Sequence, residues 1–316
     1  MTARPRIAVI GAGPAGLSCA QRLAEGGIEP DILEKSRGIG GRVATRQRNG
    51  MQFDHGAQFL PLEDGDDLLR RAEASGSAAP WPAGAPTGEA VPWVGVPRMK
   101  DALQPICDGR AILFKHEIIH IKRSGAVWSL QTEVATLCYD AVVFAAPAPQ
   151  ILRALDASEQ ALWEDLSRIR FEPCHALMAV FEGRPPWPDV VRDAPDPFEL
   201  IVRDSAKPGR PAEAECWVAH STAAWSETRL ELPPEQVAGA LLSALLEALG
   251  SLPPVVATTG HRWRFSQPSR SLGADFAESA CGTLLAGGDW ARGRTVADAL
   301  SSGRAMANAL LQRLSR

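Results

Sequence analysis

The sequence predicts an α/β fold in two lobes: a Rossmann-like domain on a parallel sheet and a second, mainly antiparallel α+β lobe. Three observations predict it. A β-α-β pattern with a glycine-rich turn fills the first 35 residues. The C-terminal part has a similar pattern, which consists of a strand, a Gly-Gly-Asp turn and a long helix. Between these ends, short extended segments alternate with helices and proline-rich loops, which is typical of an antiparallel lobe.

The opening pattern consists of three elements in direct succession. Ile7–Ile10 is a short apolar run typical of a buried strand, and Pro14–Ala24 has apolar side chains at helical spacing. Asp31–Leu33 is a second strand, which ends at Glu34. Two strands joined by a helix in this way pair in parallel.

The later elements are predicted from the same two periodicities. A weak helix is expected near Asp67–Ala74, another helix over Arg98–Cys107, and a β-meander from strands at 112–123 and 126–138. Prolines stop a buried strand at Ala141–Ala145. The remaining expectations are helices at Glu159–Ser167, Pro234–Leu249 and Val296–Leu314, extended segments at His175–Phe181, Glu199–Val202 and Glu215–His220, and a strand at Thr283–Ala286.

Composition narrows the class of protein. The 316 residues are 45% hydrophobic with a formal net charge of −4, which argues against a nucleic-acid-binding surface. No apolar run approaches the roughly 20 residues that span a bilayer, and no signal peptide precedes the first strand. The six cysteines are scattered, without a CxxC or metal-ligand spacing. We therefore expect a cytoplasmic protein with free thiols, no metal, and no membrane or nucleic-acid partner.

A glycine-rich turn carries the first chemical signal. Gly11-x-Gly13-x-x-Gly16 directly follows a strand and opens a helix. The glycines allow a tight turn and close approach of backbone to a pyrophosphate, to which the helix N-terminus presents free N–H groups. At the end of the second strand, Glu34 can accept hydrogen bonds from ribose hydroxyls. Together these features predict a dinucleotide, without separating FAD from NAD.

Two further features favour FAD. In the loop Gly38–Arg42, glycines bring backbone near the diphosphate and the Arg42 guanidinium can bind a phosphate. Near the C-terminus, Gly288 and Asp289 lie between a strand and a helix that starts near Thr295. There the carboxylate can bind ribityl hydroxyls while the helix N-terminus faces the flavin's pyrimidine carbonyl.

With these motifs the chain resembles the flavin-containing amine oxidase superfamily over nearly its whole length. The motifs are GAGPAG (11–16), Glu34, GIGGR (38–42) and GGDW (287–290). Four shorter stretches resemble bacterial renalases within that superfamily: 54–59, 93–95, 146–150 and 261–263. The resemblance implies a FAD-binding domain of the glutathione-reductase type. Because no cysteine lies where the superfamily attaches its flavin, it also implies that FAD is bound non-covalently.

The resemblance implies a specific oxidation. Renalases oxidise 2- and 6-dihydro-NAD(P), isomers of NAD(P)H, by hydride transfer to flavin N5, giving NAD(P)+ and then H2O2 from O2. A dihydropyridine is already a hydride donor, so we expect no catalytic acid or base and assign the chemistry to the flavin. No second GxGxxG is present, which argues against a separate NADPH domain and favours O2 as the direct acceptor.

Two alternatives stay open at the level of sequence. The superfamily motifs alone also fit a flavin amine oxidase, or a related oxidase or desaturase of another small molecule. Amine oxidases commonly face the flavin with two aromatic residues, often tyrosines, and this chain has only Tyr139. The nine tryptophans can substitute, so this observation weakens the amine hypothesis without excluding it. A flavin-binding protein without turnover, such as a sensor, is the second alternative.

The expected sites follow from the motifs. Residues expected to bind the cofactor are Gly11, Ala12, Gly13, Ala15, Gly16, Glu34, Lys35, Gly41, Arg42, Gly56, Ala57, Gln58, Ile119, Gly288, Asp289 and Val296. Residues expected to bind the substrate are Gln58, Phe59, Leu60, Trp93, Val94, Gly95, His261, Trp263 and Arg294. Trp93 offers an aromatic face for a nicotinamide ring, Arg294 a partner for a substrate phosphate, and the contact of Ile119 would be through its backbone. Trp217 and His220, three residues apart on a strand, would point to opposite faces and receive no role.

The two lobes are expected to interleave along the chain. The FAD-binding domain is assigned to residues 1–60, 98–147 and 261–316. The substrate-binding lobe is assigned to residues 61–97, which are rich in Pro, Gly, Ala and Trp, and to residues 148–260.

Overall fold

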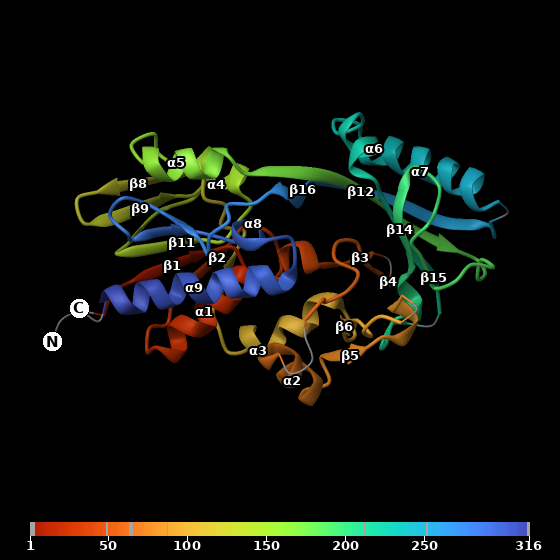
Figure 1. Cartoon of the computed structure of the whole chain (residues 1–316), viewed down its shortest axis with the longest axis horizontal. Helices are drawn as coiled ribbons and strands as arrows, with labels where there is room; N and C mark the ends of the chain where they lie inside the picture. The colour runs from red at the N-terminus through yellow and green to blue at the C-terminus, as the bar shows by residue number, and fades with distance from the viewer. Residues whose placement is uncertain are drawn as a thin grey trace. The chain divides into compact units, whose positions relative to one another are not determined.

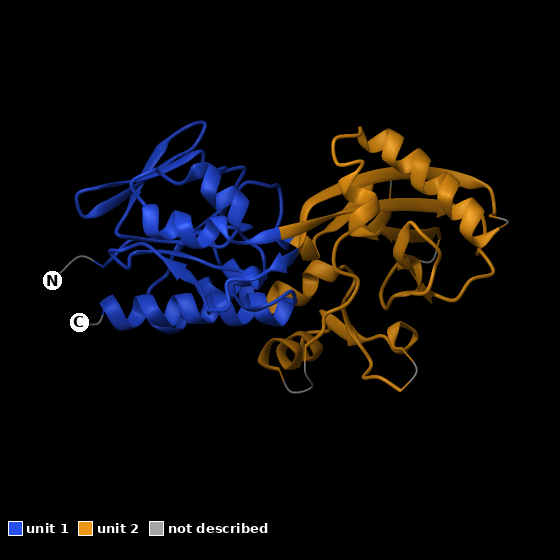
Figure 2. Ribbon diagram, turned by 45° about the horizontal axis from the view of Figure 1, so that its top comes forward, with its two compact units in different colours: residues 1–41, 106–170, 268–316 blue, residues 42–105, 171–267 orange. Residues whose placement is uncertain are grey.

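The computed structural model describes residues 4–48, 50–62, 66–86, 88–211, 213–250 and 252–314. The chain divides into two compact units, coloured separately in Figure 2. Unit 1 contains residues 1–41, 106–170 and 268–316, and unit 2 contains residues 42–105 and 171–267. Relative to the expected domains, residues 42–60, 98–105 and 261–267 fall in unit 2 and residues 148–170 in unit 1. The assignment of one domain to cofactor and the other to substrate stays a prediction.

Unit 1 is built on a six-stranded sheet, of which β1, β2 and β11 are labelled in Figure 1. Its strands pair in parallel except for the antiparallel edge pair β17–β18. Every residue of β1, β11 and β18 is buried, as expected where helices cover both faces of a parallel sheet. In spatial order the strands are β17 (Ala277–Glu278), β18 (Leu284–Ala286), β11 (Ala141–Phe144), β1 (Ile7–Ile10), β2 (Asp31–Glu34) and β7 (Ile112–Phe114).

Helices from the two ends of the chain pack together in unit 1. α1 (Pro14–Glu25) and α9 (Val296–Leu314) run side by side in Figure 1. A Cβ at Gly303 would lie 2.1 Å from the Ala15 oxygen, so only glycine permits this approach. Ser18 Oγ donates to the Leu300 oxygen over 2.9 Å. The other elements of unit 1 are α4 (Ala148–Ala154), α5 (Gln160–Ser167), α8 (Asp289–Arg292) and the meander β8 (His120–Ser124), β9 (Val127–Gln131) and β10 (Thr136–Tyr139).

Unit 2 contains an antiparallel sheet with a core on each face. One face packs against α7 (Pro234–Leu249), where Leu177, Trp217 and Leu241 are buried together. The opposite face buries Met178 and Val218 around Phe53. In spatial order the strands are β13 (Val190–Val191), β14 (Phe198–Arg203), β15 (Glu215–Ser221), β12 (Arg170–Phe181) and β16 (Val255–Arg270). Shorter elements are α2 (Asp67–Ala74), α6 (Ala223–Glu227) and the hairpins β3–β4 (Thr45–Arg48, Met51–Asp54) and β5–β6 (Ala78–Pro80, Trp93–Gly95).

The predicted fold class, a Rossmann-like α/β domain with a second lobe, is confirmed, and most long elements lie where the sequence places them. Three expectations are wrong. The strand predicted at 126–138 is the hairpin of β9 and β10, because Thr132 N donates to the Ala135 oxygen and turns the chain between them. The helix predicted over Arg98–Cys107 is a 3-10 helix at Met99–Leu103 followed by the short α3 (Gln104–Cys107), because Pro105 removes a backbone donor within it. The strand predicted at 112–123 is two strands: β7 joins the parallel sheet and β8 begins the meander. Lys115, with φ +60°, bends the chain between them.

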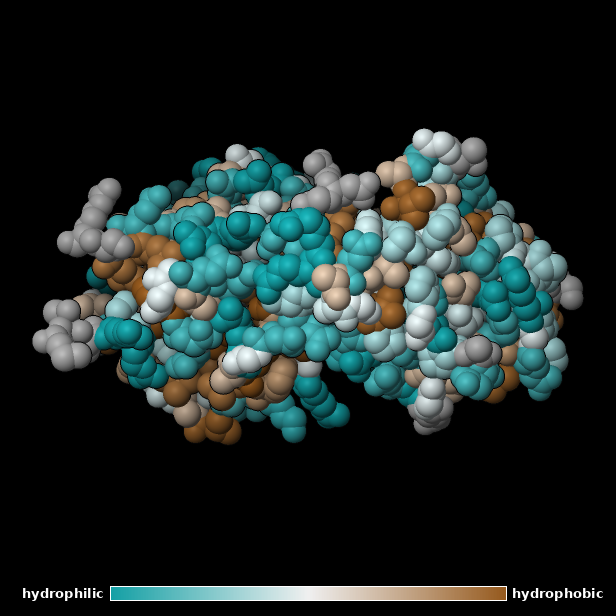
Figure 3. All heavy atoms as spheres, turned by 90° about the horizontal axis from the view of Figure 1, so that it is seen from below, coloured by the Kyte–Doolittle hydropathy of each residue, from teal (hydrophilic) through white to brown (hydrophobic). Residues whose placement is uncertain are grey.

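The surface is mixed rather than dominated by one apolar face. In Figure 3, hydrophilic side chains cover most of the visible face and hydrophobic groups form separate patches. The large apolar side chains that are exposed, such as Val134 and Trp163, come from different elements. Such scattered residues are normal on a folded protein. Across the part of the chain that the structure describes, no helix is long and apolar enough to cross a membrane.

Candidate functional site

Two glycines of the N-terminal turn are required by the packing of unit 1 itself. Gly11 has φ +103° and donates to the Leu33 oxygen over 2.7 Å. A Cβ at Gly11 would lie 2.4 Å from the Ala145 oxygen, and one at Gly16 would lie 1.8 Å from the Gly11 oxygen. These glycines therefore let the turn, β11 and the start of α1 pack closely, whatever the turn binds.

Gly13 differs, because nothing in unit 1 requires a glycine there. Its φ of −84° suits any residue, and an added Cβ would find its nearest atoms at 4.0 Å. Gly13 is the N-cap of α1, and it has no side chain that could accept from the N–H groups of the first turn. Pro14 follows at the first helical position. The first-turn N–H groups of α1 thus border space beside Gly13, and this cradle fits the close approach of a pyrophosphate.

Glu34 is buried beside the same turn, with 8% of its surface exposed. Its Oε2 accepts from Ala12 N over 2.8 Å and its Oε1 from Ser36 N over 2.7 Å. Each carboxylate oxygen keeps a second lone pair, so the group can still accept from ribose hydroxyls. Gly40 N donates to the Ala12 oxygen over 2.9 Å, which ties the loop that ends at Gly41 to the turn. The residues present therefore fit the ADP half of FAD.

Two other expected cofactor residues lie elsewhere on unit 1. Lys35 Nζ donates to Gln150 Oε1 over 2.9 Å. Ile119 lies just before β8, where its N–H donates to the Gln131 oxygen over 2.8 Å and its side chain is 47% exposed. The exposed side chain agrees with a residue whose contact would come from its backbone.

The C-terminal elements of unit 1 present a second helix N-terminus. Asp289, 4% exposed, begins α8, and its neighbour Trp290 donates from Nε1 to the Ala146 oxygen over 2.9 Å. Before α9, Thr295 Oγ1 accepts from Asp298 N while Asp298 Oδ2 accepts from Thr295 N. This capping box leaves the N–H groups of Val296 and the next residue for another acceptor.

Arg294, expected to bind a substrate phosphate, is exposed just ahead of that box. Its backbone N–H donates to Asp298 Oδ2 over 3.0 Å. The structure thus holds the backbone of Arg294 in the capping loop and leaves its side chain on the surface of unit 1.

Arg42 begins unit 2 and is engaged there. Its guanidinium donates from NH1 to the Ser266 oxygen over 2.9 Å and lies 5.9 Å from the centre of the Phe171 ring. Its backbone oxygen accepts from Ala57 N over 2.8 Å. A Cβ at Gly56 would lie 2.0 Å from that oxygen, so the segment that begins at Gly56 packs directly on Arg42.

Gln58 lies within a buried polar network of unit 2. Its Nε2 donates to the backbone oxygens of Asp54 and Gly56, and its Oε1 accepts from Lys207 Nζ over 2.9 Å. Only 4% of Gln58 is exposed. Both the nitrogen and the oxygen of this amide, which is predicted to contact cofactor and substrate, are therefore hydrogen-bonded within unit 2.

The next two stretches predicted to bind substrate pair with each other. Leu60 N donates to the Trp93 oxygen over 2.8 Å, which sets the segment after Gln58 beside β6. Leu60 and Val94 pack in the interior, with 1% and 0% of their surfaces exposed. Phe59 stacks on Trp81, with ring centroids 5.9 Å apart. A Cβ on Gly95, the last residue of β6, would lie 2.2 Å from the Met99 oxygen.

The sequence places His261 and Trp263 on one face of a strand, and the structure brings them together. Their ring centroids are 4.5 Å apart on β16, and the ring of His55 lies 4.6 Å from His261 and 4.9 Å from Trp263. The His55 backbone oxygen accepts from Trp263 Nε1 over 2.8 Å and pairs with His220 Nε2 over 3.1 Å. We call His55, His261 and Trp263 the histidine–tryptophan cluster.

The histidines around this cluster are held neutral. Burial, assisted by the charge of Arg46, lowers the pKa of His261 to about 4. Burial and the neighbouring His261 lower the pKa of His55 to about 3, and burial lowers that of His220 to about 4. Within the described ranges, no group of three or more His, Cys, Asp or Glu is arranged to hold a metal. The three side chains of the cluster are therefore neutral, and the charge of Arg46 acts on both of its histidines.

Sequence reasoning missed His55, His220 and Lys207 as parts of this region. It correctly placed Trp217 and His220 on opposite faces, since Trp217 packs in the core under α7 while His220 meets His55. The short sequence around Lys207 contains charges, Pro and Gly, and is typical of an exposed turn. No local sequence pattern indicates that Lys207 has Asp54 as a partner, because the two residues are 153 positions apart.

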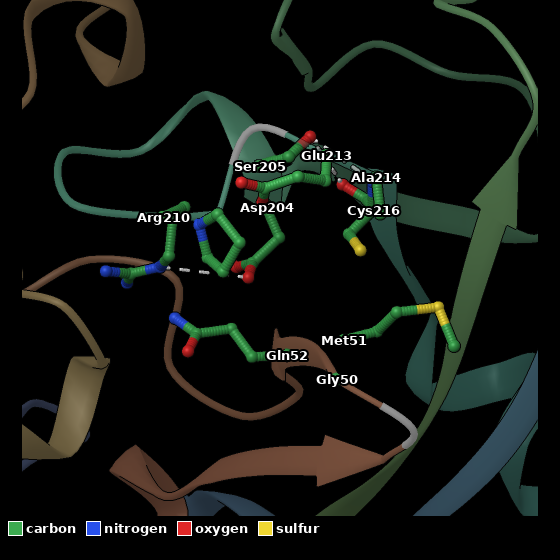
Figure 4. Close-up of a pocket in the computed structure, with 10 residues that line it drawn as sticks. Gly50, Met51, Gln52, Asp204, Ser205, Arg210, Glu213, Ala214 and Cys216 are labelled. Atoms are coloured by element: carbon green, nitrogen blue, oxygen red, sulfur yellow. Dashed lines mark hydrogen bonds and ion pairs between the residues drawn. The ribbon is translucent and has the colours of Figure 1, made fainter.

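A small cavity lies beside the buried network in unit 2, shown in Figure 4. Its volume of about 40 Å³ holds water molecules rather than an organic substrate. Gln52, Asp204, Arg210 and Cys216 are among the residues that line it. It is therefore not a substrate pocket.

Family comparisons agree with this geometry. Residues 9–72 match the family described as NAD(P)-binding Rossmann-like domain, and residues 89–311 match the family described as Flavin containing amine oxidoreductase. The second match spans well over half of the chain, and the chain belongs to that family. Membership of this family implies a flavin cofactor.

Individual relatives are more distant. Over 59 residues the chain is 42% identical to a 4,4'-diapophytoene desaturase (4,4'-diaponeurosporene-forming) of Staphylococcus aureus (strain Newman); the match covers 19% of this chain and 12% of the desaturase. Cyclohexylamine oxidase from Brevibacterium oxydans IH-35A has a similar structure, with a TM-score of 0.69 at 12% identity, covering 99% of this chain and 100% of that one. A putrescine oxidase has a TM-score of 0.71 at 12% identity, covering 98% and 99%. At these identities the structures share the fold.

Proposed function

We propose that this protein is an FAD-dependent oxidase of 2- or 6-dihydro-NAD(P), with O2 as acceptor. The balanced reaction is dihydro-NAD(P) + O2 + H+ giving NAD(P)+ and H2O2. FAD would be held non-covalently, would accept the hydride at N5 and would pass the electrons to O2. This proposal narrows the family-level activity to one class of substrate, and the four renalase-like stretches of sequence support it.

The N-terminal turn, Glu34 and the C-terminal helix starts would hold the cofactor. The first turn of α1 would bind the pyrophosphate beside Gly13, and Glu34 would bind ribose hydroxyls. Asp289 would bind ribityl hydroxyls, and Val296 N–H would donate to the flavin's pyrimidine carbonyl. Gly56, Ala57 and Gln58 are the proposed contacts from unit 2.

The observation that carries the substrate proposal is the histidine–tryptophan cluster. A flat, neutral dihydropyridine becomes a cation when it gives up its hydride. Neutral imidazoles do not repel that cation, and the indole face of Trp263 can attract it. Hydride transfer from a dihydropyridine requires orientation rather than a base, and none of the three side chains in the cluster is acidic.

The position of Tyr139 supports the same choice over an amine oxidase. Tyr139 ends β10, is 2% exposed, and donates from its hydroxyl to Asp31 Oδ2 over 3.0 Å. Asp31 is the first residue of β2, whereas Glu34 at the other end of that strand lies beside the glycine turn. The only tyrosine is therefore at the opposite end of the sheet from the cofactor motif and cannot face a flavin there.

The alternative is oxidation or desaturation of an amine or another small molecule. The family match supports it, as do the names of two proteins with similar structures, an oxidase of cyclohexylamine and one of putrescine. Aromatic side chains other than tyrosine, such as Trp263, can supply an aromatic wall for such a substrate.

Anaerobic mixing of the purified holoprotein with single substrates separates these functions. The compounds to be mixed in turn are each dihydronicotinamide isomer, ordinary NADH, cyclohexylamine and putrescine. The absorbance of the flavin at about 450 nm is followed after each mixing. Rapid bleaching by a 2- or 6-dihydro isomer, with none by NADH or amines, is the expected result. Bleaching by an amine and by no isomer would establish the alternative, and bleaching by no compound would contradict both.

A further inference from the structure

A fully buried ionic network lies behind the Asp54–Gln58 segment of unit 2. Lys207 Nζ has three acceptors: Asp54 Oδ2 at 3.1 Å, Gln58 Oε1 at 2.9 Å and Asp204 Oδ1 at 2.8 Å. Arg210 pairs with Asp54 as well, and its Nε lies 3.9 Å from Asp204 Oδ2. The dashed line in Figure 4 marks the pair of Arg210 with Asp204. At most 1% of any of these four charged side chains is exposed.

Stability alone is a weak reason for such a network. Two cations and two anions balance in charge, but removing four ions from water is costly, and well-packed apolar residues often serve stability equally well. Burial and the charge of Asp54 raise the pKa of Asp204, whereas Lys207 and Arg210, acting against burial, hold that of Asp54 far below its usual value. Because its charged groups are held at short distances and in fixed orientations, this network is suited to fixing the geometry of the segment that it contacts.

The contacted element is a short loop that is held from several sides. Thr45 Oγ1 donates to Asp54 Oδ1 over 2.5 Å, and Gln58 bridges its own loop by donating to the Asp54 and Gly56 oxygens. Between them, Ala57 N donates to the Arg42 oxygen. Lys207 contacts both ends of the loop, since it binds the Asp54 carboxylate and the Gln58 amide.

We propose that Lys207 is a positioning residue, which orients Gln58 and through it sets the backbone of Gly56 and Ala57 against the flavin. This inference rests on the proposed function, which assigns 56–58 to the cofactor. Lys207 has 0% of its side chain exposed and binds Gln58 Oε1, so it determines which face of the amide carries the oxygen and which the N–H groups. Its own role is to hold the loop, and it does not touch the substrate.

The test compares two charge-balanced double variants of the full chain. Asp204→Asn/Lys207→Met removes one anion and one cation and leaves the Asp54–Arg210 pair, which protects folding. The control, Arg203→Met/Glu215→Gln, removes a neighbouring ion pair between β14 and β15, in which Arg203 Nε lies 2.8 Å from Glu215 Oε2. No hydrogen bond or ion pair that the structure gives Arg203 or Glu215 involves residues 54–58.

Two readouts are measured, amide hydrogen exchange of residues 54–60 and the dissociation constant of added FAD. In Asp204→Asn/Lys207→Met we expect exchange in this loop to quicken at least about tenfold relative to the control, and FAD to bind at least about tenfold more weakly with an altered visible spectrum. The single variant Lys207→Arg should keep loop exchange and FAD affinity close to those of the wild type. Equal loop exchange in the two double variants would overturn the inference. If the wild-type protein binds no FAD, the proposed function fails, and loop exchange still decides whether Lys207 holds the loop.

Discussion

Trp263 donates its indole N–H to the backbone oxygen of His55 over 2.8 Å, across 208 residues of sequence. The same oxygen pairs with His220, so one peptide group is held by an indole and an imidazole. Gly56 follows that peptide directly, and a Cβ on it would lie 3.2 Å from the Trp263 ring. The strand β16 thus supports the loop whose next residues are proposed to meet the flavin, and it supplies the aromatic surface beside it.

Replacing Trp263 with Phe keeps an aromatic ring and removes this hydrogen bond. We expect flavin bleaching by the reactive dihydro isomer to slow about fivefold, in line with the roughly 1 kcal/mol of one hydrogen bond. Trp187→Phe is the matched control, because the buried Nε1 of Trp187 has no partner in the described part of the chain. Stopped-flow absorbance measures both. Equal slowing in the two variants would show that the hydrogen bond has no effect on the reaction.

The glycine turn gives a prediction that separates binding from folding. Gly13→Ala meets no atom of unit 1 closer than 4.0 Å, so the free energy of unfolding of the apoprotein should change by less than about 1 kcal/mol. Its methyl group would occupy the space proposed for the pyrophosphate, and FAD should bind at least about tenfold more weakly.

Gly16→Ala provides the contrast, because its Cβ would lie 1.8 Å from the Gly11 oxygen. It should lower the free energy of unfolding of the apoprotein by about 1–3 kcal/mol or more. Denaturant titration of both apoproteins and fluorescence titration with FAD make the comparison. Tight FAD binding by Gly13→Ala would argue that the pyrophosphate lies elsewhere.

Tyr139→Phe tests whether the only tyrosine is remote from the reaction. The substitution removes the hydroxyl bound to Asp31 and should lower the free energy of unfolding by about 1 kcal/mol. The rate of flavin bleaching by dihydro isomers and the visible spectrum should stay those of the wild type. A large loss of bleaching rate without a loss of stability would place Tyr139 in the reaction and revive the amine hypothesis.

The neutral histidines predict the direction of the acid response. His55, His220 and His261 have pKa values of about 3 to 4 when folded, and an ordinary value near 6.5 when unfolded. Between these values the unfolded chain binds more protons, so stability is full above about pH 7 and falls as pH drops toward 4. Each histidine adds about 1.4 kcal/mol per pH unit to that slope.

The His220→Gln variant isolates one of these titrations. Gln has an amide N–H that can donate to the His55 oxygen, and it does not titrate. The free energy of unfolding is measured by thermal or urea denaturation between about pH 4.5 and about pH 7. In the variant it should change with pH less steeply than in the wild type, by about 1.4 kcal/mol per pH unit. An unchanged slope would mean that His220 is not held neutral in the folded protein.

Local pattern was sufficient for much of this molecule. The bounds expected for α2, α7 and α9 agree with the structure, because each helix carries a regular apolar stripe. The glycine turn, Glu34 and the pairing of His261 with Trp263 also follow from spacing alone. By contrast, the β3–β4 hairpin and the true ends of β16 depend on partners that are distant along the chain.

The buried network illustrates why the rest could not be predicted. Lys207 and Asp54 are hydrophilic residues far apart in sequence, and each alone is typical of a surface. In the folded protein Lys207 Nζ lies 3.1 Å from Asp54 Oδ2, and neither side chain is exposed. The sequence predicts that Gln58 contacts cofactor and substrate, which stays a prediction. It does not predict the hydrogen bonds of the Gln58 amide to Lys207 and to its own loop, because these depend on tertiary contacts.

The packing of α1 against α9 has a consequence for the rate of folding. Gly303 lets α9 pack on Ala15, and the hydrogen bond between Ser18 and Leu300 joins the same two helices across 282 residues of sequence. The sheet depends on similarly distant pairs, because β1 pairs with β11 and β11 with β18. Closing such long loops costs conformational entropy before the contacts can offset it, so we expect unit 1 to fold slowly for its size.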